Sequence, residues 1–266
     1  MPETLSVTSR EHVTTVTIEV KTMPPRLFQE LGAAFDEIAA DPEVRAVIVR
    51  SSQQHFTYGL DLGAAMAELG SGVQGGLAGP RLALHQTILR LQSYLSAVAA
   101  CPVPVIAAIH GWCIGGGIDL ACACDLRYAA SDARFSVRET RIAIVADLGT
   151  LQRLPSVVGE GHARELAFTG RDIDAARARE IGLVNDVAPD HESLLALAES
   201  TAAQIVENAP ITVRGVKRVL DFGRGRRVAD GLDYVAAWNA AFLASEDLGE
   251  AVTAFLEKRQ PKFTGR

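Results

Sequence analysis

The amino-acid sequence predicts an α/β protein whose strands are mainly parallel and joined by helical crossovers. Three observations lead to this fold class. Short apolar, β-branched runs alternate with segments of helical periodicity. A strand, a glycine-containing loop and a helix follow one another twice, around Gly59 and around Gly115. From about residue 190 the pattern is helical only, so we divide the chain into a mixed core, residues 1–195, and a helical region, residues 196–266.

The individual elements follow from local patterning. Alternating apolar and polar residues predict two strands at the start, with a hairpin around residues 10–12. Apolar residues at helical spacing after Pro25 predict a helix that ends near Pro42, and the next apolar run predicts a buried strand. Expected strands span 5–7, 13–20, 44–50, 105–109 and 183–187; expected helices span 27–38, 81–99, 157–168, 175–181, 192–206, 211–222 and 230–256, the last interrupted near Ser245.

Two of these segments carry further expectations. Residues 81–99 should form a long amphipathic helix with Leu82, Ile88, Leu91 and Leu95 among its apolar positions. Residues 69–80, which precede it, are rich in glycine and serine, so a mobile loop is expected there.

Composition limits the classes of function. With 266 residues, 48% of them hydrophobic, the chain can bury a large core. A net charge of −6 without a basic tract argues against nucleic acid or an anionic membrane as the main partner. The four cysteines lack CxxC spacing and the six histidines lack metal-ligand spacing, so we expect buried thiols in a reducing compartment and no metal site.

The chain also shows no targeting or membrane signal. Its N-terminal residues lack an apolar signal region, no uninterrupted apolar stretch reaches membrane length, and the final residues TGR are not a peroxisomal address. These features predict a soluble cytoplasmic protein.

The stretch from residue 109 to residue 155 holds the strongest functional signal. A triple glycine, Gly115–Gly117, follows an apolar strand and opens a helix, and three carboxylates follow it: Asp119, Glu139 and Asp147. Backbone N–H groups at such a turn, together with the helix dipole, can bind an oxygen that gains negative charge. The order of strand, turn and helix therefore predicts an oxyanion hole.

Each carboxylate has an alternative, structural interpretation. Asp147 precedes a helix and could be its N-cap. The role of Asp119 could be limited to a favourable interaction with a helix dipole. Glu139 could be a solvated charge beside Arg138 and Arg141. No single residue is specific for a function, whereas the set is.

Several segments together resemble the crotonase, or enoyl-CoA hydratase and isomerase, superfamily over about residues 5–263. They are HFTYGLDL, HGWCIGGGIDLACACDLRYAASDARFSVRE, ADLGTLQRLP and FLEKRQPKF. Within it, the set Asp119, Glu139 and Asp147 is similar to that of the Δ3,5-Δ2,4-dienoyl-CoA isomerases, since hydratases normally have glycine at the position of Asp147. The resemblance implies a spiral of ββα units and a C-terminal helical region, residues 196–266, for trimerisation and pocket closure.

The resemblance also implies the ligand and the roles of residues. An acyl-CoA thioester is the expected substrate, with no separate cofactor because coenzyme A is part of that substrate, and a trimer or dimer of trimers is expected. Glu139 would take a proton from carbon 2, Asp147 would supply one at carbon 6, and Asp119 would orient Glu139. The oxyanion-hole N–H groups would be those of Leu60 and Gly116. Other expected substrate contacts are Tyr58, Gly59, Asp61, Gly115 and Gly117.

Two further functions stay open at this point: an enoyl-CoA hydratase using Asp119 and Glu139, and a non-catalytic acyl-CoA-binding protein. The sequence departs from the family at VKTMPPRLFQEL, residues 20–31, where Lys21 or Arg26 would replace a usual basic contact to coenzyme A. Lys258, Arg259 and Lys262 would reach its phosphates or form a solvated basic tail.

Overall fold

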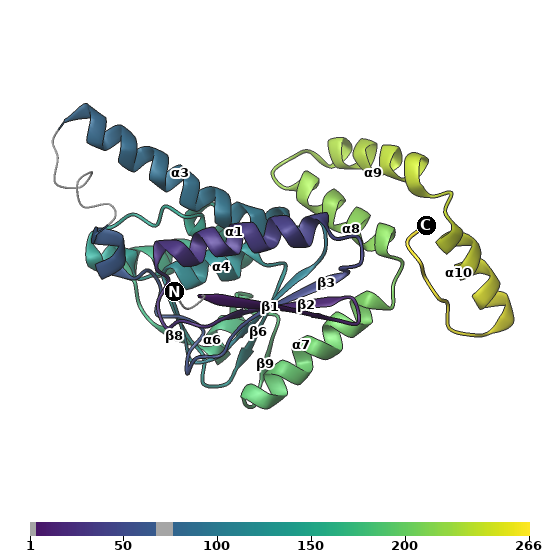
Figure 1. Ribbon diagram of the computed structural model, residues 1–266, viewed down its shortest axis with the longest axis horizontal. Coiled ribbons are helices and arrows are strands. Elements are labelled where there is room, and N and C mark those ends of the chain that lie inside the picture. Colours follow the sequence, from purple (N-terminus) through teal and green to yellow (C-terminus); the bar gives the residue numbers. More distant parts are fainter. Residues whose placement is uncertain (1–3, 68–76) are drawn as a thin grey trace.

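The computed structural model describes residues 4–67 and 77–266. Its helices pack around two β-sheets (Figure 1). The strands are β1 (Leu5–Arg10), β2 (Val13–Ile18), β3 (Ala46–Ser51), β4 (Val105–Ile109), β5 (Trp112–Ile114), β6 (Leu126–Ala130), β7 (Arg134–Ser136), β8 (Ile173–Asp174) and β9 (Asp186–Ala188). The larger sheet has the order β1-β2-β3-β4-β6-β9 and the smaller one the order β5-β7-β8.

The helical part comprises nine labelled α-helices, one short 3₁₀ helix, η1, and a helical segment at 62–67, all counted within the described ranges. They are α1 (Pro25–Ala40), α3 (Ala78–Ala100), α4 (Gly116–Ala123), η1 (Glu139–Ile142), α5 (Thr150–Thr169), α6 (Ala175–Glu180), α7 (His191–Val206), α8 (Pro210–Gly223), α9 (Val228–Phe242) and α10 (Glu246–Glu257).

The chain winds through the two sheets in repeated ββα units. β4 lies in the larger sheet, β5 lies in the smaller sheet and α4 follows, and the order repeats with β6, β7 and then η1 and α5. Apart from the β1–β2 hairpin, which is antiparallel, every pair in the larger sheet is parallel. The expected α/β class with parallel strands and helical crossovers is confirmed.

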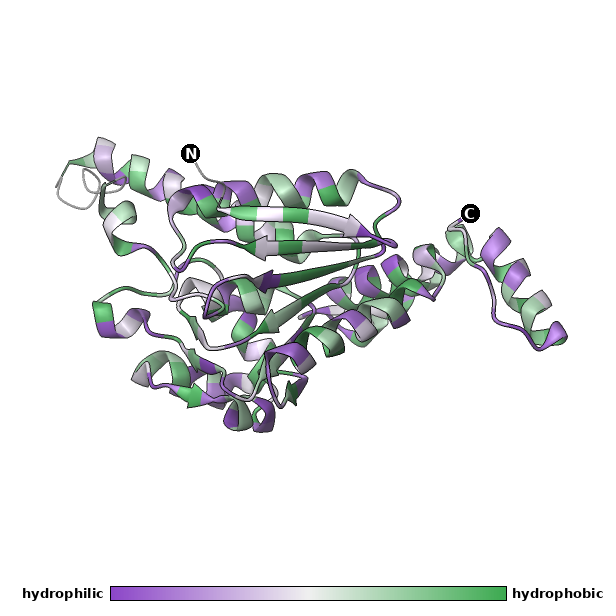
Figure 2. Cartoon of the chain, turned by 60° about the horizontal axis from the view of Figure 1, so that its bottom comes forward, coloured by the Kyte–Doolittle hydropathy of each residue, from purple (hydrophilic) through white to green (hydrophobic). Residues whose placement is uncertain are grey.

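Helices cover both faces of the larger sheet. Of its central strands, β4 is apolar along its whole length and β3 is apolar from Ala46 to Val49 (Figure 2). The main core includes the buried face of α1, whose Leu27, Leu31, Phe35 and Ile38 are buried as their spacing predicts. On the other face, α7 buries Leu194 and small alanines against the strands. Because its contacting residues are small, α7 can lie close to the sheet.

Several boundaries differ from the sequence prediction. α3 begins at Ala78 instead of residue 81, and its N-terminal half is exposed, with Leu82 58% accessible; burial starts only at Leu91. α5 begins at Thr150 instead of residue 157 and contains a kink at Gly159, where φ is +79°. Residues 68–76, most of the expected loop at 69–80, lie outside the described residues.

The C-terminal helices leave the body of the molecule (Figure 1). α8 packs against α9, while α10 lies furthest from the sheets. α7 runs across the expected division between residues 195 and 196 and belongs to the packing on the sheet. The helices that extend outward are therefore α9 and α10.

Candidate active site

The glycine turn lies where the smaller sheet meets α4. A strand missed by sequence patterning, β5, separates the apolar strand β4 from the turn, because the predicted strand ends at Ile109 and the chain enters the second sheet at Trp112. Gly115 then has a φ of +52° and is the N-cap of α4, and Gly116 is the first helical residue. The N–H of Gly116 therefore has no partner within its helix.

A second loop approaches this turn closely. Gly59 has a φ of +83°, and a Cβ there would lie 2.6 Å from the carbonyl oxygen of Ile114. The chain around Leu60 is held by hydrogen bonds from Met23 N–H to Gly59 O, 2.8 Å, and from Asp61 N–H to Met23 O, 3.0 Å.

The two predicted oxyanion donors are neighbours. The nitrogen of Leu60 lies 3.8 Å from the point that a Cβ on Gly116 would occupy. Within residues 4–67 and 77–266, neither the N–H of Leu60 nor that of Gly116 donates a hydrogen bond. The structure thus brings two available N–H groups from two loops to one place.

Asp119 is buried in the first turn of α4, with 1% of its surface exposed. Its Oδ1 accepts two hydrogen bonds from Thr150, one from the N–H at 2.6 Å and one from the hydroxyl at 2.7 Å. Burial raises the pKa of Asp119 to about 6 although these bonds oppose the shift. Asp119 therefore does more than interact with a helix dipole, since it caps the start of α5.

Glu139 is the first residue of η1 and lies against the glycine turn. Its Oε1 is 3.3 Å from the position of a Cβ on Gly115, and its Oε2 is buried with no hydrogen-bond partner in the described chain. Burial raises its pKa to about 7, and the charges of Asp119 and Asp147 add to the shift. A carboxylate with this pKa can exchange protons near neutral pH.

The solvated alternative for Glu139 is wrong. Arg138 instead pairs with Asp172 at 2.5 Å and lies over the ring of Trp112. No ion pair joins Glu139 to either neighbouring arginine in the described ranges.

Asp147 lies in a segment without regular secondary structure, between η1 and α5. It is half-buried, and burial raises its pKa. The alternative that Asp147 caps α5 is wrong, because the N-cap is Gly149 and the carboxylate bound to the first turn is that of Asp119. The charge of Asp147 also adds to the raised pKa values of both Glu139 and Asp119.

Other predicted contacts have structural partners. Asp61 accepts hydrogen bonds from Thr22 Oγ1 and Ala64 N–H, both at 2.9 Å, and so holds its own loop. Tyr58 is 42% exposed and packs edge-on against His55. A Cβ on Gly117, the third glycine of the turn, would lie 2.6 Å from the methyl group of Thr57.

The basic residues considered for coenzyme A differ in availability. Lys21 is exposed, whereas Arg26 pairs with Glu30. Near the C-terminal end, Arg259 pairs with Glu250 and Glu257. The Glu250 carboxylate raises the pKa of the Arg259 guanidinium above its ordinary value.

Sequence reasoning missed two side chains near the carboxylates. Thr150 binds Asp119, and a threonine at the start of a helix was a signal that could have suggested a capping role. Gln92 in α3 donates to the carbonyl oxygen of Asp147 at 2.6 Å. Nothing in the helical pattern around Gln92 marks it.

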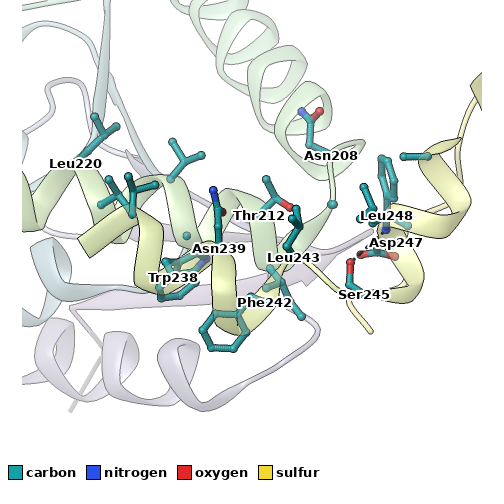
Figure 3. A pocket seen from close by; sticks show the side chains of 18 residues that line it. Asn208, Thr212, Leu220, Trp238, Asn239, Phe242, Leu243, Ser245, Asp247 and Leu248 are labelled. Atoms are coloured by element: carbon teal, nitrogen blue, oxygen red, sulfur yellow. Dashed lines mark hydrogen bonds between the residues drawn. The ribbon is translucent and has the colours of Figure 1, made fainter. Parts of the chain in front are cut away.

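A separate apolar groove of about 500 Å³ lies between α8, α9 and α10 (Figure 3). Trp238, Phe242, Leu220 and Leu248 are among its lining residues, and none of the three carboxylates is. Within the described ranges, no three His, Cys, Asp or Glu side chains are placed to hold a metal ion, and no helix is both long and apolar enough to span a membrane.

Comparison with known proteins places this geometry in context. Residues 10–266 match the family model described as enoyl-CoA hydratase/isomerase. A Dictyostelium discoideum protein named mitochondrial Δ(3,5)-Δ(2,4)-dienoyl-CoA isomerase is 44% identical over 92% of this chain and 84% of its own length. A peroxisomal protein of the same name from Arabidopsis thaliana is 43% identical over 89% of this chain and 85% of its own length.

Solved structures show the same fold. The crystal structure of an enoyl-CoA hydratase from Bacillus anthracis covers 99% of this chain and 100% of its own, with a TM-score of 0.89 and 32% sequence identity. The ββα spiral expected from the resemblance is thereby confirmed. The expectation of a cytoplasmic location is wrong on these findings, because the similar relatives are named mitochondrial or peroxisomal.

Proposed function

This chain belongs to the enoyl-CoA hydratase/isomerase family, and from that premise we propose that it converts 3,5-dienoyl-CoA into 2,4-dienoyl-CoA thioesters. One observation carries the proposal beyond the family. A third carboxylate, that of Asp147, is present besides Asp119 and Glu139; burial raises its pKa, and its charge adds to the raised pKa values of the other two. An isomerase that shifts two double bonds needs acid–base groups at both ends of the diene.

Removal of a proton from carbon 2 places negative charge on the thioester oxygen. The N–H groups of Leu60 and Gly116 are preorganised to bind that oxygen, each contributing about 3 kcal/mol to transition-state stabilisation in comparable sites. Coenzyme A enters as part of the substrate, and exposed Lys21 is the candidate for binding it at the divergent 20–31 segment.

The proton transfers divide between two residues. Glu139, beside the turn, removes the proton from carbon 2, and its pKa of about 7 matches a group that must accept and release protons near neutral pH. The negative charge spreads along the dienolate to carbon 6, where Asp147, protonated when the substrate binds, supplies a proton. Glu139 then releases its proton to solvent and Asp147 takes one up, which restores the starting state. Asp119 ties α4 to the start of α5 through its two hydrogen bonds from Thr150, three residues after Asp147, and its charge adds to the raised pKa of Glu139.

The test is an ultraviolet assay with 3,5-octadienoyl-CoA and crotonyl-CoA in parallel, on the native chain and Asp147→Asn. We expect isomerisation by the native chain and its loss in the variant, because no proton then reaches carbon 6. Hydration of crotonyl-CoA that survives the substitution, without isomerisation by either protein, would support a hydratase instead. Tight acyl-CoA binding with neither activity would support a binding protein.

We also propose that α8, α9 and α10 form the contact between copies of the chain, as a trimer or a dimer of trimers. The outward helices expose large apolar side chains, among them Phe255 at 82% and Leu256 at 73%, and they border the apolar groove in Figure 3. Contiguous exposed apolar surface is typical of an interface. Sedimentation of Phe255→Asp should show a smaller assembly than the native chain; a native chain that is already monomeric would contradict the proposal.

A further inference from the structure

The Asp147 segment has little backbone support of its own. Residues 144–147 belong to no helix or strand, so no ladder of hydrogen bonds holds them. Ala146 and Leu148 are buried on either side of Asp147. In this part of the described chain, the carbonyl oxygen of Asp147 is held by one side chain, the amide of Gln92 at 2.6 Å.

Gln92 comes from a well-anchored part of α3. Leu91 and Leu95 on the same helix are buried in the main core, whereas the N-terminal half of α3 is exposed. One helical turn beyond Gln92, Ser96 accepts a hydrogen bond from Arg153 at 3.2 Å. Residues four apart lie on one face of a helix. This face of α3 therefore contacts the chain at both Asp147 and Arg153.

We propose that Gln92 is a positioning residue for Asp147 in the isomerisation, and this inference rests on the function proposed above. Its amide fixes the backbone from which the Asp147 carboxylate projects, and so sets the distance from that carboxylate to carbon 6. It does not touch the reacting atoms. Small displacements of an acid from its proton acceptor lower the rate strongly.

The two proton transfers make this role measurable. Exchange of the carbon 2 proton with D₂O needs Glu139 and the oxyanion hole, whereas complete isomerisation also needs Asp147. Gln92→Met keeps the length of the side chain but removes the donor. We expect kcat for isomerisation to fall about tenfold with KM within about twofold, while deuterium continues to enter carbon 2 of recovered 3,5-octadienoyl-CoA at the native rate.

Two further variants complete the experiment. Gln86→Met makes the same change at an exposed position of the same helix and should leave both rates unchanged. Gln92→Lys restores an N–H donor and should recover part of the lost kcat, which a general loss of folding in Gln92→Met would not predict.

The outcomes are distinct. Equal loss of exchange and isomerisation in Gln92→Met, or isomerisation at the native rate, would overturn the positioning role. No isomerisation by the native chain would instead overturn the proposed function, and with it this inference.

Discussion

Asp119→Asn should make the protein more stable at alkaline pH. The Asp119 carboxyl group has a pKa of about 6 in the folded chain and an ordinary value of 3.8, because burial disfavours its charge. The folded state therefore binds this proton more tightly than the unfolded state does. Stability from this group is complete below pH 3.8 and is lost as the pH rises through 6.

The size of the effect follows from the difference between the two pKa values. A difference of two pKa units corresponds to about 3 kcal/mol of unfolding free energy. Asp119 contributes this amount to the stability of the native chain at acid pH and none of it at pH 8. About half of this loss falls between pH 5 and pH 8. Asparagine keeps an oxygen that can accept both hydrogen bonds from Thr150, so the substitution mainly removes the buried charge.

Urea unfolding at several pH values, at one fixed protein concentration, measures this effect. The difference in unfolding free energy between Asp119→Asn and the native chain should grow by more than about 1 kcal/mol from pH 5 to pH 8. Fixed concentration matters because assembly contributes to apparent stability. Parallel curves for the two proteins across this range would refute the argument that Asp119 is ionised at a cost in the folded chain.

Three other substitutions test separate parts of the site and fold. Asp147→Asn should move the acid limb of carbon 2 exchange to lower pH, because removing the Asp147 charge lowers the pKa of Glu139; an unchanged profile against pH would contradict this. Gly59→Ala should lower kcat about 10²-fold or more, since its Cβ would press on a backbone carbonyl 2.6 Å away and displace the neighbouring oxyanion donor; a steady-state assay measures it. Lys217→Met should lower the free energy of unfolding, measured with urea, by about 3 kcal/mol, because Asp125, which pairs with Lys217 at 2.6 Å, loses its counter-charge. The double substitution Lys217→Met with Asp125→Asn should recover part of this loss.

Local patterning predicted most helices and most strands of the larger sheet, but it missed β6 in that sheet and all three strands of the smaller sheet. The hairpin, α1 and the C-terminal helices follow from periodicity and turn residues, which act within a few positions of the chain. β5 has only three residues and pairs with β7, so its existence depends on a partner distant in sequence. The N-terminal half of α3 was expected to bury an apolar face, but it is exposed. Apolar spacing alone does not show whether another element packs against that face.

The same limit applies to the site. The glycine turn and three carboxylates were identified because glycine and acidic residues stand out in an apolar stretch. Thr150 and Gln92 were missed because their importance lies in hydrogen bonds across the fold, two from α5 to Asp119 in α4 and one from α3 to the backbone of Asp147. A glutamine in a helix has no signal of its own until its neighbour in space is known.

The arrangement of the carboxylates also explains how the site tolerates three acidic groups, of which Asp119 is buried and Glu139 and Asp147 are half-buried. Each comes from a different element: Asp119 from α4, Glu139 from η1 and Asp147 from the segment before α5. Burial raises all three pKa values, that of Asp119 to about 6 and that of Glu139 to about 7, so near neutral pH Glu139 holds a proton for part of the time. A proton on Glu139 lowers the repulsion among the three, and Glu139, the residue beside the turn, must release it before it can take one from carbon 2. Burial, with repulsion from the other two carboxylates added to it, thus moves the pKa of Glu139 into the pH range in which a single group can serve as both acid and base.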